Sequence, residues 1–279
     1  MSVIIVRYAE LGLKSRTVRR HFETMLRDNI LSRLAADGVE ALLSSEEGRF
    51  YVEADNIDKA VDSLRRVFGV ASISVAETCG SFMEEICASA ASYSRGRILP
   101  NQSFAVRPRR EGTHPYTSVD IGREVGAAVF LANEDLGVCV DLSHPDFTLF
   151  VEVRGPRAYL FDKYIPGPGG LPMGSQGKVL ARVTSDQDAL AAWLMMRRGC
   201  KVLVIGQAHP LLKRYDHDLS LLPGDVDENL GSRGVLGLVL GLGMEDFEGI
   251  KRMRYSLPVY HPLIGMDKKE IERRLNEMV

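Results

Sequence analysis

The sequence has no apolar run near the roughly 18 residues that a membrane-spanning helix needs. Its N-terminus, MSVIIVRYAE, becomes charged too soon for a secretory signal peptide. The four cysteines lie far apart and form no CxxC pair, which argues against a zinc site and against a disulfide framework. We therefore expect a cytoplasmic protein without a membrane partner.

An excess of basic residues is also missing, since the formal net charge is -2. Any anionic partner must therefore meet a local patch of positive charge. One such patch follows Ile86, where five arginines occur before Glu111 without an intervening acid: Arg95, Arg97, Arg107, Arg109 and Arg110. The six histidines show no HxH or HxxxH spacing, so we expect no metal site.

What is present is a composition typical of folded proteins, with 45% hydrophobic and 26% charged residues. A chain of 279 residues can form two or three domains. Strand and helix patterns alternate through the first part: a buried strand at 3–8, a helix capped by Ser15, a strand at 49–54, a helix closed by Gly69, and a strand from Ala71. The first helix has one apolar face, formed by Val18, Phe22, Met25, Leu26, Ile30 and Leu34. This order predicts a ferredoxin-like α+β unit.

A second α/β block of about 85 residues follows, including the strand SFAVRPR and the helix SVDIGREVGAAVFLAN. The segment 164–177 is rich in glycine and proline and is the best linker candidate. Its apolar Leu171 and Met173 indicate that it is pinned to a surface. The remaining chain has three short, almost wholly apolar runs, as a parallel sheet buried on both faces requires, and ends in a helix that Asp267 can cap.

Six blocks, in order along the chain, resemble tRNA 4-thiouridine synthetase, also called tRNA sulfurtransferase. They are VRYAELGLKS, FAVRPRREGTHPYTSVDIGREVG, VDLSHPDFTLFVEV, GPGGLPMGSQGKVL, AAWLMMRRGCKV and LPVYHPLIGMDKKEI. The resemblance implies an N-terminal ferredoxin-like domain (1–74), a THUMP RNA-binding domain (75–163), the linker (164–177) and a Rossmann-like, parallel-sheet domain of the PP-loop ATP pyrophosphatase type (178–279). In this family ATP and magnesium adenylate the uridine at position 8 of tRNA, and sulfur from a cysteine persulfide replaces its oxygen.

The turn between the first strand and helix of the C-terminal domain departs from that family. The family has SGGxDS there, and its glycines let backbone N–H groups close on phosphate. This chain has no glycine in the turn and an acid where a glycine is expected, which would repel a triphosphate. The residues of this vestigial ATP loop are Arg182, Val183, Thr184, Ser185, Asp186 and Asp188.

Two further departures concern the chemistry. The family motif of the form GESxGQVxSQT is replaced by VLGLVLGLGMEDFEGIKRM, in which only Gly241 matches the motif, and no cysteine follows Cys200. We therefore expect no catalytic residues and no cofactor. The alternative is an active sulfurtransferase with an altered nucleotide loop, which would need ATP and magnesium and take its sulfur from elsewhere.

Two other interpretations of this turn involve no nucleotide. Asp186 or Asp188 would simply cap the helix of a βαβ unit, or the helix N-terminus would serve another anion. For the RNA, the THUMP resemblance favours phosphate contacts by Arg107, Arg109 and Arg110 at the exposed end of a strand, with His114 and Arg123 on the following segment. Without the resemblance, these arginines are equally well a solvated loop. Lys14 is either part of this surface or an ordinary exposed lysine. The expected partners are tRNA, an active sulfurtransferase or sulfur donor protein and, from the resemblance alone, a second copy of the chain.

Overall fold

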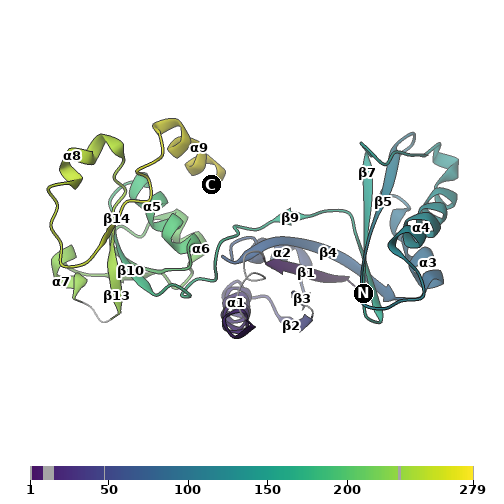
Figure 1. Ribbon diagram of the computed structural model, residues 1–279, viewed down its shortest axis with the longest axis horizontal. Helices are drawn as coiled ribbons and strands as arrows, with labels where there is room; N and C mark the ends of the chain where they lie inside the picture. The colour runs from purple at the N-terminus through teal and green to yellow at the C-terminus, as the bar shows by residue number, and fades with distance from the viewer. Residues whose placement is uncertain (1, 9–15, 47, 232–233, 279) are drawn as a thin grey trace. The chain divides into compact units, whose positions relative to one another are not determined.

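The computed structural model describes residues 2–8, 16–46, 48–231 and 234–278 (Figure 1). Contacts divide the chain into two compact units. The first contains Met1–Val6, Tyr51–Ile57 and Ile73–Ile165, and the second contains Arg7–Phe50, Asp58–Ser72 and Pro166–Val279. The cap expected from Ser15 lies outside the described residues.

Among the described residues, the larger of two sheets has nine strands, in the order β2-β3-β1-β4-β8-β7-β5-β6 with β9 paired to β4. Within the first unit β5 runs parallel to β7, and β8 is antiparallel to both β7 and β4. The strands are β1 (Ser2–Tyr8), β2 (Ala41–Glu46), β3 (Arg49–Ala54), β4 (Val70–Gly80), β5 (Ser103–Glu111), β6 (Cys139–Val140), β7 (Phe147–Arg154), β8 (Arg157–Phe161) and β9 (Ile165–Pro166).

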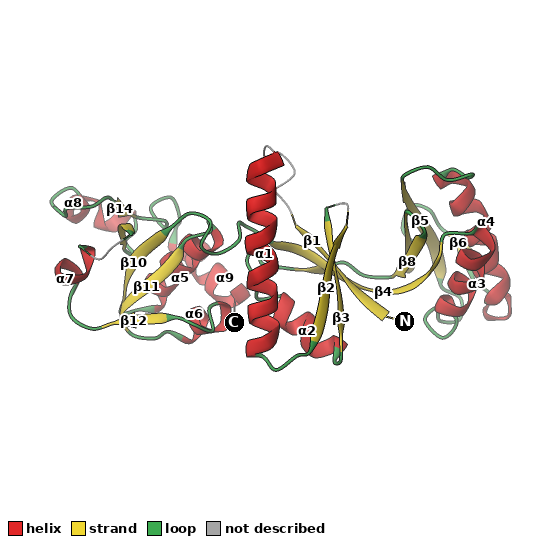
Figure 2. Ribbon diagram, turned by 90° about the horizontal axis from the view of Figure 1, so that it is seen from below, coloured by secondary structure: helices red, strands yellow, loops and turns green. Residues whose placement is uncertain are grey.

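Two helices cover one face of the strands in the first unit, α3 (Met83–Ser94) and α4 (Ser118–Ala132) (Figure 2). Their apolar stripes pack on the inward side chains of β5, β7 and β8 in one buried cluster. Thr117 starts α4 in a capping box with Asp120. A short 3-10 helix (Glu134–Leu136) then leads to β6.

In the second unit, α1 (Arg16–Ala36) buries the expected face of Phe22, Leu26, Ile30 and Leu34. The expectation for Val18 is wrong, since 41% of this side chain is exposed. Helix α2 (Ile57–Leu64) also ends earlier than expected. Tight turns follow it, with Arg66 N–H donating to Ser63 O and Val67 N–H to Leu64 O.

The glycine- and proline-rich segment is tied to its surroundings by backbone hydrogen bonds. Gly167 N–H donates to Ala71 O at 3.0 Å, and Gly169 N–H donates to Val70 O at 2.8 Å. Leu171 N–H donates to Arg197 O at 3.0 Å. We call residues 166–171 the strap. Their backbone is hydrogen-bonded to Val70 and Ala71, which follow α2, and to Arg197, at the end of helix α5 (Asp186–Arg197). The proposed domain boundaries themselves stay predictions.

The second sheet is parallel, with the order β12-β11-β10-β13-β14. Alternate residues of β10 face opposite clusters, with Val179, Ala181 and Val183 in one and Leu180 in the other. The expected burial of both faces is therefore confirmed. The strands are β10 (Lys178–Val183), β11 (Lys201–Gly206), β12 (Ser220–Leu222), β13 (Val235–Val239) and β14 (Val259–Tyr260).

The helices of this sheet are short apart from α5 and α9. One face packs against α5, α6 and α9, and the other packs against α7 (Figure 1). Asp267 accepts a hydrogen bond from Glu270 N–H at 2.8 Å, which confirms the expected cap of α9. The elements are α5 (Asp186–Arg197), α6 (Pro210–Tyr215), α7 (Val226–Leu230), a 3-10 helix (Met244–Asp246), α8 (Phe247–Ile250) and α9 (Lys268–Met278).

Candidate nucleotide and RNA sites

The carboxyl ends of β10, β11 and β13 meet at one edge of the parallel sheet. In open α/β sheets this edge is where ligands bind. The turn after β10 runs into α5, and Ser185 is the N-cap residue of that helix. Its side chain accepts a hydrogen bond from Asp188 N–H at 3.2 Å, so the expectation that an aspartate caps α5 is wrong. Ser185 reaches the cap position because β10 ends two residues earlier, at Val183.

The carboxylate of Asp188, in the first turn of α5, binds donors of the preceding turn and of the loop after β13. Its Oδ2 accepts from Thr184 N–H at 3.0 Å, from Thr184 Oγ1 at 2.8 Å and from Ser185 Oγ at 3.0 Å. Its Oδ1 accepts from Gly241 N–H at 3.1 Å. Only 9% of Asp188 is exposed. The backbone N–H groups of Thr184 and Gly241 at this edge are therefore already used by a side chain of the protein.

Gly241, two residues beyond β13, is in close contact with Asp188 at the start of α5. A Cβ at Gly241 would lie 2.7 Å from Asp188 N, closer than any ordinary contact. The Gln187 side chain adds a hydrogen bond to Gly241 O at 2.7 Å. The two loops are thus in contact, without space between them for a ligand group.

The other residues of the expected vestigial loop have separate roles. Val183 is fully buried in the core, and Arg182 is exposed on β10. Asp186 points its carboxylate to His209 Nε2 at 3.0 Å, and 78% of the Asp186 side chain is exposed. The second acid of the turn is thus drawn away from α5 toward the start of α6. The sequence had not indicated a role for His209.

The arginines of the RNA hypothesis lie within β5, not at its exposed end. Arg107, Arg109 and Arg110 pair with Phe150, Glu152 and Val153 of β7. Because side chains alternate along a strand, Arg107 and Arg109 share one face and are exposed, while Arg110 belongs to the other and is half-buried. The three arginines therefore do not form one contact surface.

The remaining RNA candidates have partners of their own. His114 stacks on Tyr116 with ring centroids 5.5 Å apart, and its Nε2 lies 3.1 Å from Glu111 O. Arg123 forms ion pairs with Glu124 at 3.1 Å and Asp120 at 3.6 Å, so much of its charge is balanced locally. Lys14 lies outside the described residues.

An apolar groove of about 830 Å³ lies between α4, β5 and β6, and sequence reasoning missed it. Arg107 and Arg123 both line it, whereas Arg109, Arg110 and His114 do not. Its exposed apolar side chains include Val119, Leu131, Val140 and Leu142. The signal in the sequence was the apolar positions of SVDIGREVGAAVFLAN that exceed one helical stripe.

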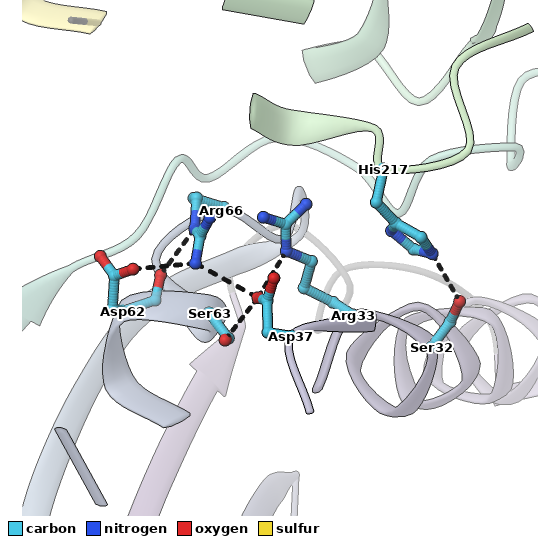
Figure 3. Close-up of polar contacts among 7 residues, drawn as sticks. All are labelled: Ser32, Arg33, Asp37, Asp62, Ser63, Arg66 and His217. Carbon is cyan, nitrogen blue, oxygen red and sulfur yellow. Dashed lines mark hydrogen bonds and ion pairs between the residues drawn. The ribbon is translucent and has the colours of Figure 1, made fainter. Parts of the chain in front are cut away.

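A polar network joins α1 and the end of α2 within the second unit (Figure 3). Asp37 accepts from Arg33 Nε at 2.9 Å, from Ser63 Oγ at 2.6 Å and from Arg66 Nη2 at 3.2 Å. Burial alone would raise the pKa of Asp37, but the Ser63 hydrogen bond and the charges of Arg33 and Arg66 hold it below its usual value. Beside this network, Ser32 Oγ lies 3.2 Å from His217 Nε2.

No group of three or more potential ligand residues is placed to hold a metal among residues that the structure describes. Asp216, which lies near His217 in the sequence, instead forms an ion pair with Lys201 at 2.8 Å. Within the same residues, no helix is both long and apolar enough to cross a bilayer.

Comparison with known proteins identifies both N-terminal domains. The sequence model of the ThiI ferredoxin-like domain matches residues 3–74, and that of the THUMP domain matches residues 80–162.

Two curated relatives named as tRNA sulfurtransferases match nearly the whole chain. A probable tRNA sulfurtransferase of Methanosarcina mazei is 38% identical over 97% of this chain and 80% of its own length. The tRNA sulfurtransferase of Pyrobaculum aerophilum is 39% identical over 100% of this chain and 67% of its own. The match to a Methanothermobacter thermautotrophicus relative, at 36% identity, covers 73% of this chain. In that comparison the chain spans about half of the relative, 52% of its length.

The matched region of the M. mazei protein runs over 327 residues, more than the 279 of this chain. The relative therefore has residues inside the matched region that this chain lacks.

Solved structures share the fold over the whole chain. The crystal structure of PH1313 from Pyrococcus horikoshii is 30% identical, with a TM-score of 0.85, and the match covers 100% of this chain and 99% of that one. A 4-thiouridine synthetase crystallised as an RNA complex with bound ATP has a TM-score of 0.79 at 22% identity, covering 100% of this chain and 85% of that one.

Proposed function

Because the chain belongs to the tRNA sulfurtransferase family, we propose that it binds tRNA without adenylating or thiolating it. The relatives' name supports tRNA as the partner, and the THUMP match supports a dedicated domain for it. The phosphate contacts would come from Arg107 and Arg109, with a smaller contribution from Arg123 because its charge is partly balanced.

One observation carries the loss of nucleotide chemistry in this proposal. The Asp188 carboxylate accepts from Thr184 N–H, in the turn before α5, and from Gly241 N–H, and Gly241 packs against the same residue. An ATP phosphate would have to displace a covalently attached carboxylate and separate two hydrogen-bonded loops. Asp186 would add repulsion at short range. Within the matched region this chain is shorter than the M. mazei protein. The difference agrees with a domain that no longer covers a substrate.

The second candidate is an active sulfurtransferase that uses ATP and magnesium through an altered loop. The identity of 39% to a protein named tRNA sulfurtransferase favours it. In that case the turn would have to open when nucleotide binds. The two candidates differ in a single measurable property, the affinity for ATP.

Calorimetric titration with ATP and magnesium tests this proposal. We expect no binding at millimolar ATP, with tRNA binding by the same preparation as the control for folded protein. An Asp186→Gly variant removes the exposed acid but keeps Asp188, so it should also fail to bind. Micromolar affinity in the wild type, or transfer of adenylate to a tRNA transcript, would establish the second candidate instead.

The RNA part of the proposal has its own variants. Arg107→Gln with Arg109→Gln should weaken tRNA binding and lower the slope of log K against log salt by roughly 1.5, since each phosphate contact contributes about 0.7–0.9. Arg110→Gln is the matched control, because Arg110 faces the other side of β5. We call the face of β5 that carries Arg107 and Arg109 the Arg107 face. Equal effects of the two variants, or tRNA binding that does not depend on salt, would contradict phosphate contact on this face.

Other expectations from the sequence stay predictions: a cytoplasmic location, a second copy of the chain, and an active sulfurtransferase or sulfur donor as partner. A protein that positions tRNA without modifying it would need such an active partner to contribute to thiolation.

A further inference from the structure

A cleft lined by five arginines lies in the second unit, outside residues 80–162 that match the THUMP domain. Its volume is about 250 Å³. Its residues come from the end of α2, the strap, α5, α6 and α9. We call it the arginine cleft, and its charged residues are Asp62, Arg65, Arg66, Arg197, Arg214 and Arg274.

The positive charge of the cleft is only partly balanced. Arg66 is committed to Asp62 at 2.8 Å and to Asp37 at 3.2 Å (Figure 3), and Arg274 to Glu270 at 2.6 Å. Arg65 and Arg197 are exposed. Neither side chain forms an ion pair with a carboxylate in the described part of the chain. Two guanidinium groups are therefore available to an anion from outside.

The cleft is held in shape by its floor and by the strap. Trp193 and Tyr215 form the floor, and Phe68 packs on both, with centroids 5.4 Å and 5.1 Å away. At Gly170 a Cβ would lie 2.1 Å from Arg197 O, so only glycine fits where the strap crosses the end of α5. This close crossing keeps the end of α5 beside the chain that follows α2. Arg197 and Arg65 are thereby positioned in advance, which lowers the entropic cost of binding.

The two exposed guanidinium groups indicate the class of ligand that the cleft would bind. Guanidinium groups bind phosphate through two parallel hydrogen bonds. Arg65 and Arg197 therefore favour a ligand that carries phosphate.

We propose that the arginine cleft binds backbone phosphates of RNA, as a second contact besides the Arg107 face. This inference rests on the proposed function, since it takes RNA binding as given. The size of the cleft favours the backbone over a free nucleotide: about 250 Å³ is below the roughly 300–1,000 Å³ of sites that enclose a small molecule. It admits a phosphate group while the rest of the polymer stays outside.

The test is a salt titration of tRNA binding by fluorescence anisotropy with the variant Arg65→Gln/Arg197→Gln. We expect about tenfold weaker binding at physiological salt and a slope of log K against log salt that is smaller by roughly 1.5. Arg20→Gln/Arg252→Gln removes the same charge from two exposed arginines elsewhere in the second unit, and should leave both quantities unchanged. Arg65→Lys/Arg197→Lys keeps the charge without the planar fork, so it should restore the slope more fully than the affinity.

Each contrary outcome has a distinct meaning. If the glutamine variant of the cleft binds tRNA like the wild type, while Arg107→Gln/Arg109→Gln weakens it, the cleft proposal is wrong and the proposed function stands. If the wild type binds no RNA, both fall. If ATP binds the wild type and this is lost only in the cleft variant, with tRNA binding intact, the cleft serves a free nucleotide and the proposal is overturned. Thermal unfolding of each variant shows whether a loss reflects misfolding.

Discussion

Asp37 shows how one carboxylate can hold two arginines that the fold needs. The Arg33 side chain is 7% exposed and the Asp37 side chain 19%, so the pair is largely shielded from water. Removing the carboxylate would leave Arg33 buried without its partner, which costs more than the loss of the hydrogen bonds alone. The sequence does not reveal this network, because Ser63 and Arg66 are distant from Asp37 along the chain.

We predict that Asp37→Asn lowers the free energy of unfolding by about 2 kcal/mol at neutral pH. The folded-state pKa of Asp37 lies below 3.8, so its stabilising contribution is complete above that pH and is lost as the pH falls further. The difference between variant and wild type, measured by urea denaturation, should shrink below about pH 4. Asp28→Asn on α1 is the control, since that side chain is 63% exposed and its pair with Arg27 is 3.7 Å long. A constant difference down to pH 2 would contradict this account.

The start of α5 marks a limit of prediction at this scale. Ser185, Asp186 and Asp188 are all good capping residues, so composition cannot choose among them. The choice depends on where β10 ends and on Gly241 arriving from β13. The cap of α9 was predictable because a single candidate, Asp267, precedes that helix.

Among the elements, the strap is tied into the second unit by backbone hydrogen bonds to Val70, Ala71 and Arg197. Its glycines differ in a way that separates backbone strain from collision. Gly169 has a φ of +65°, and a Cβ there would meet only Arg197 Nη2, at 3.7 Å. Gly170 has a φ of +74°, and a Cβ there would lie 2.1 Å from a backbone oxygen.

We therefore predict that Gly169→Ala costs about 1 kcal/mol, from the left-handed conformation alone, and that Gly170→Ala costs at least about 3 kcal/mol. Gly170→Ala should also weaken tRNA binding, because it displaces Arg197 from the arginine cleft. Chemical denaturation and anisotropy would measure the two effects. Equal costs for both substitutions would mean that the strap yields easily at Gly170.

The elements that sequence reasoning missed are those specified by neighbours. Strand β2 is largely exposed and β12 has three residues, so neither has a recognisable apolar pattern. Strand β5 continues through Arg110 because β7 runs beside it for its whole length, and pairing between strands is not encoded locally. Strands β10, β11 and β13 were predictable from their apolar runs, because a parallel strand that is buried on both faces has to be apolar throughout.

At the scale of the whole molecule, a net charge of -2 means that RNA binding must come from local clusters. We propose two of them, the Arg107 face in the first unit and the arginine cleft in the second. If one RNA contacts both, a variant that combines the four substitutions should lose a salt slope of roughly 3, the sum of the separate losses.

Salt titrations of the wild type, both double variants and the combination would measure this additivity. A combined loss no larger than that of one double variant would mean that the two clusters do not contact the same RNA at once.

Asp188 has a further consequence for the sheet edge. A carboxylate built into the chain is present at a high effective concentration, because no translational entropy is lost when it binds. The donors of Thr184, Ser185 and Gly241 therefore behave as a receptor that carries a tethered competitor. Any free anion would need an intrinsic affinity high enough to outcompete it, so raising the ATP concentration to cellular levels would do little. Only a rearrangement of Thr184, Ser185 and Gly241 together would make the position vacant.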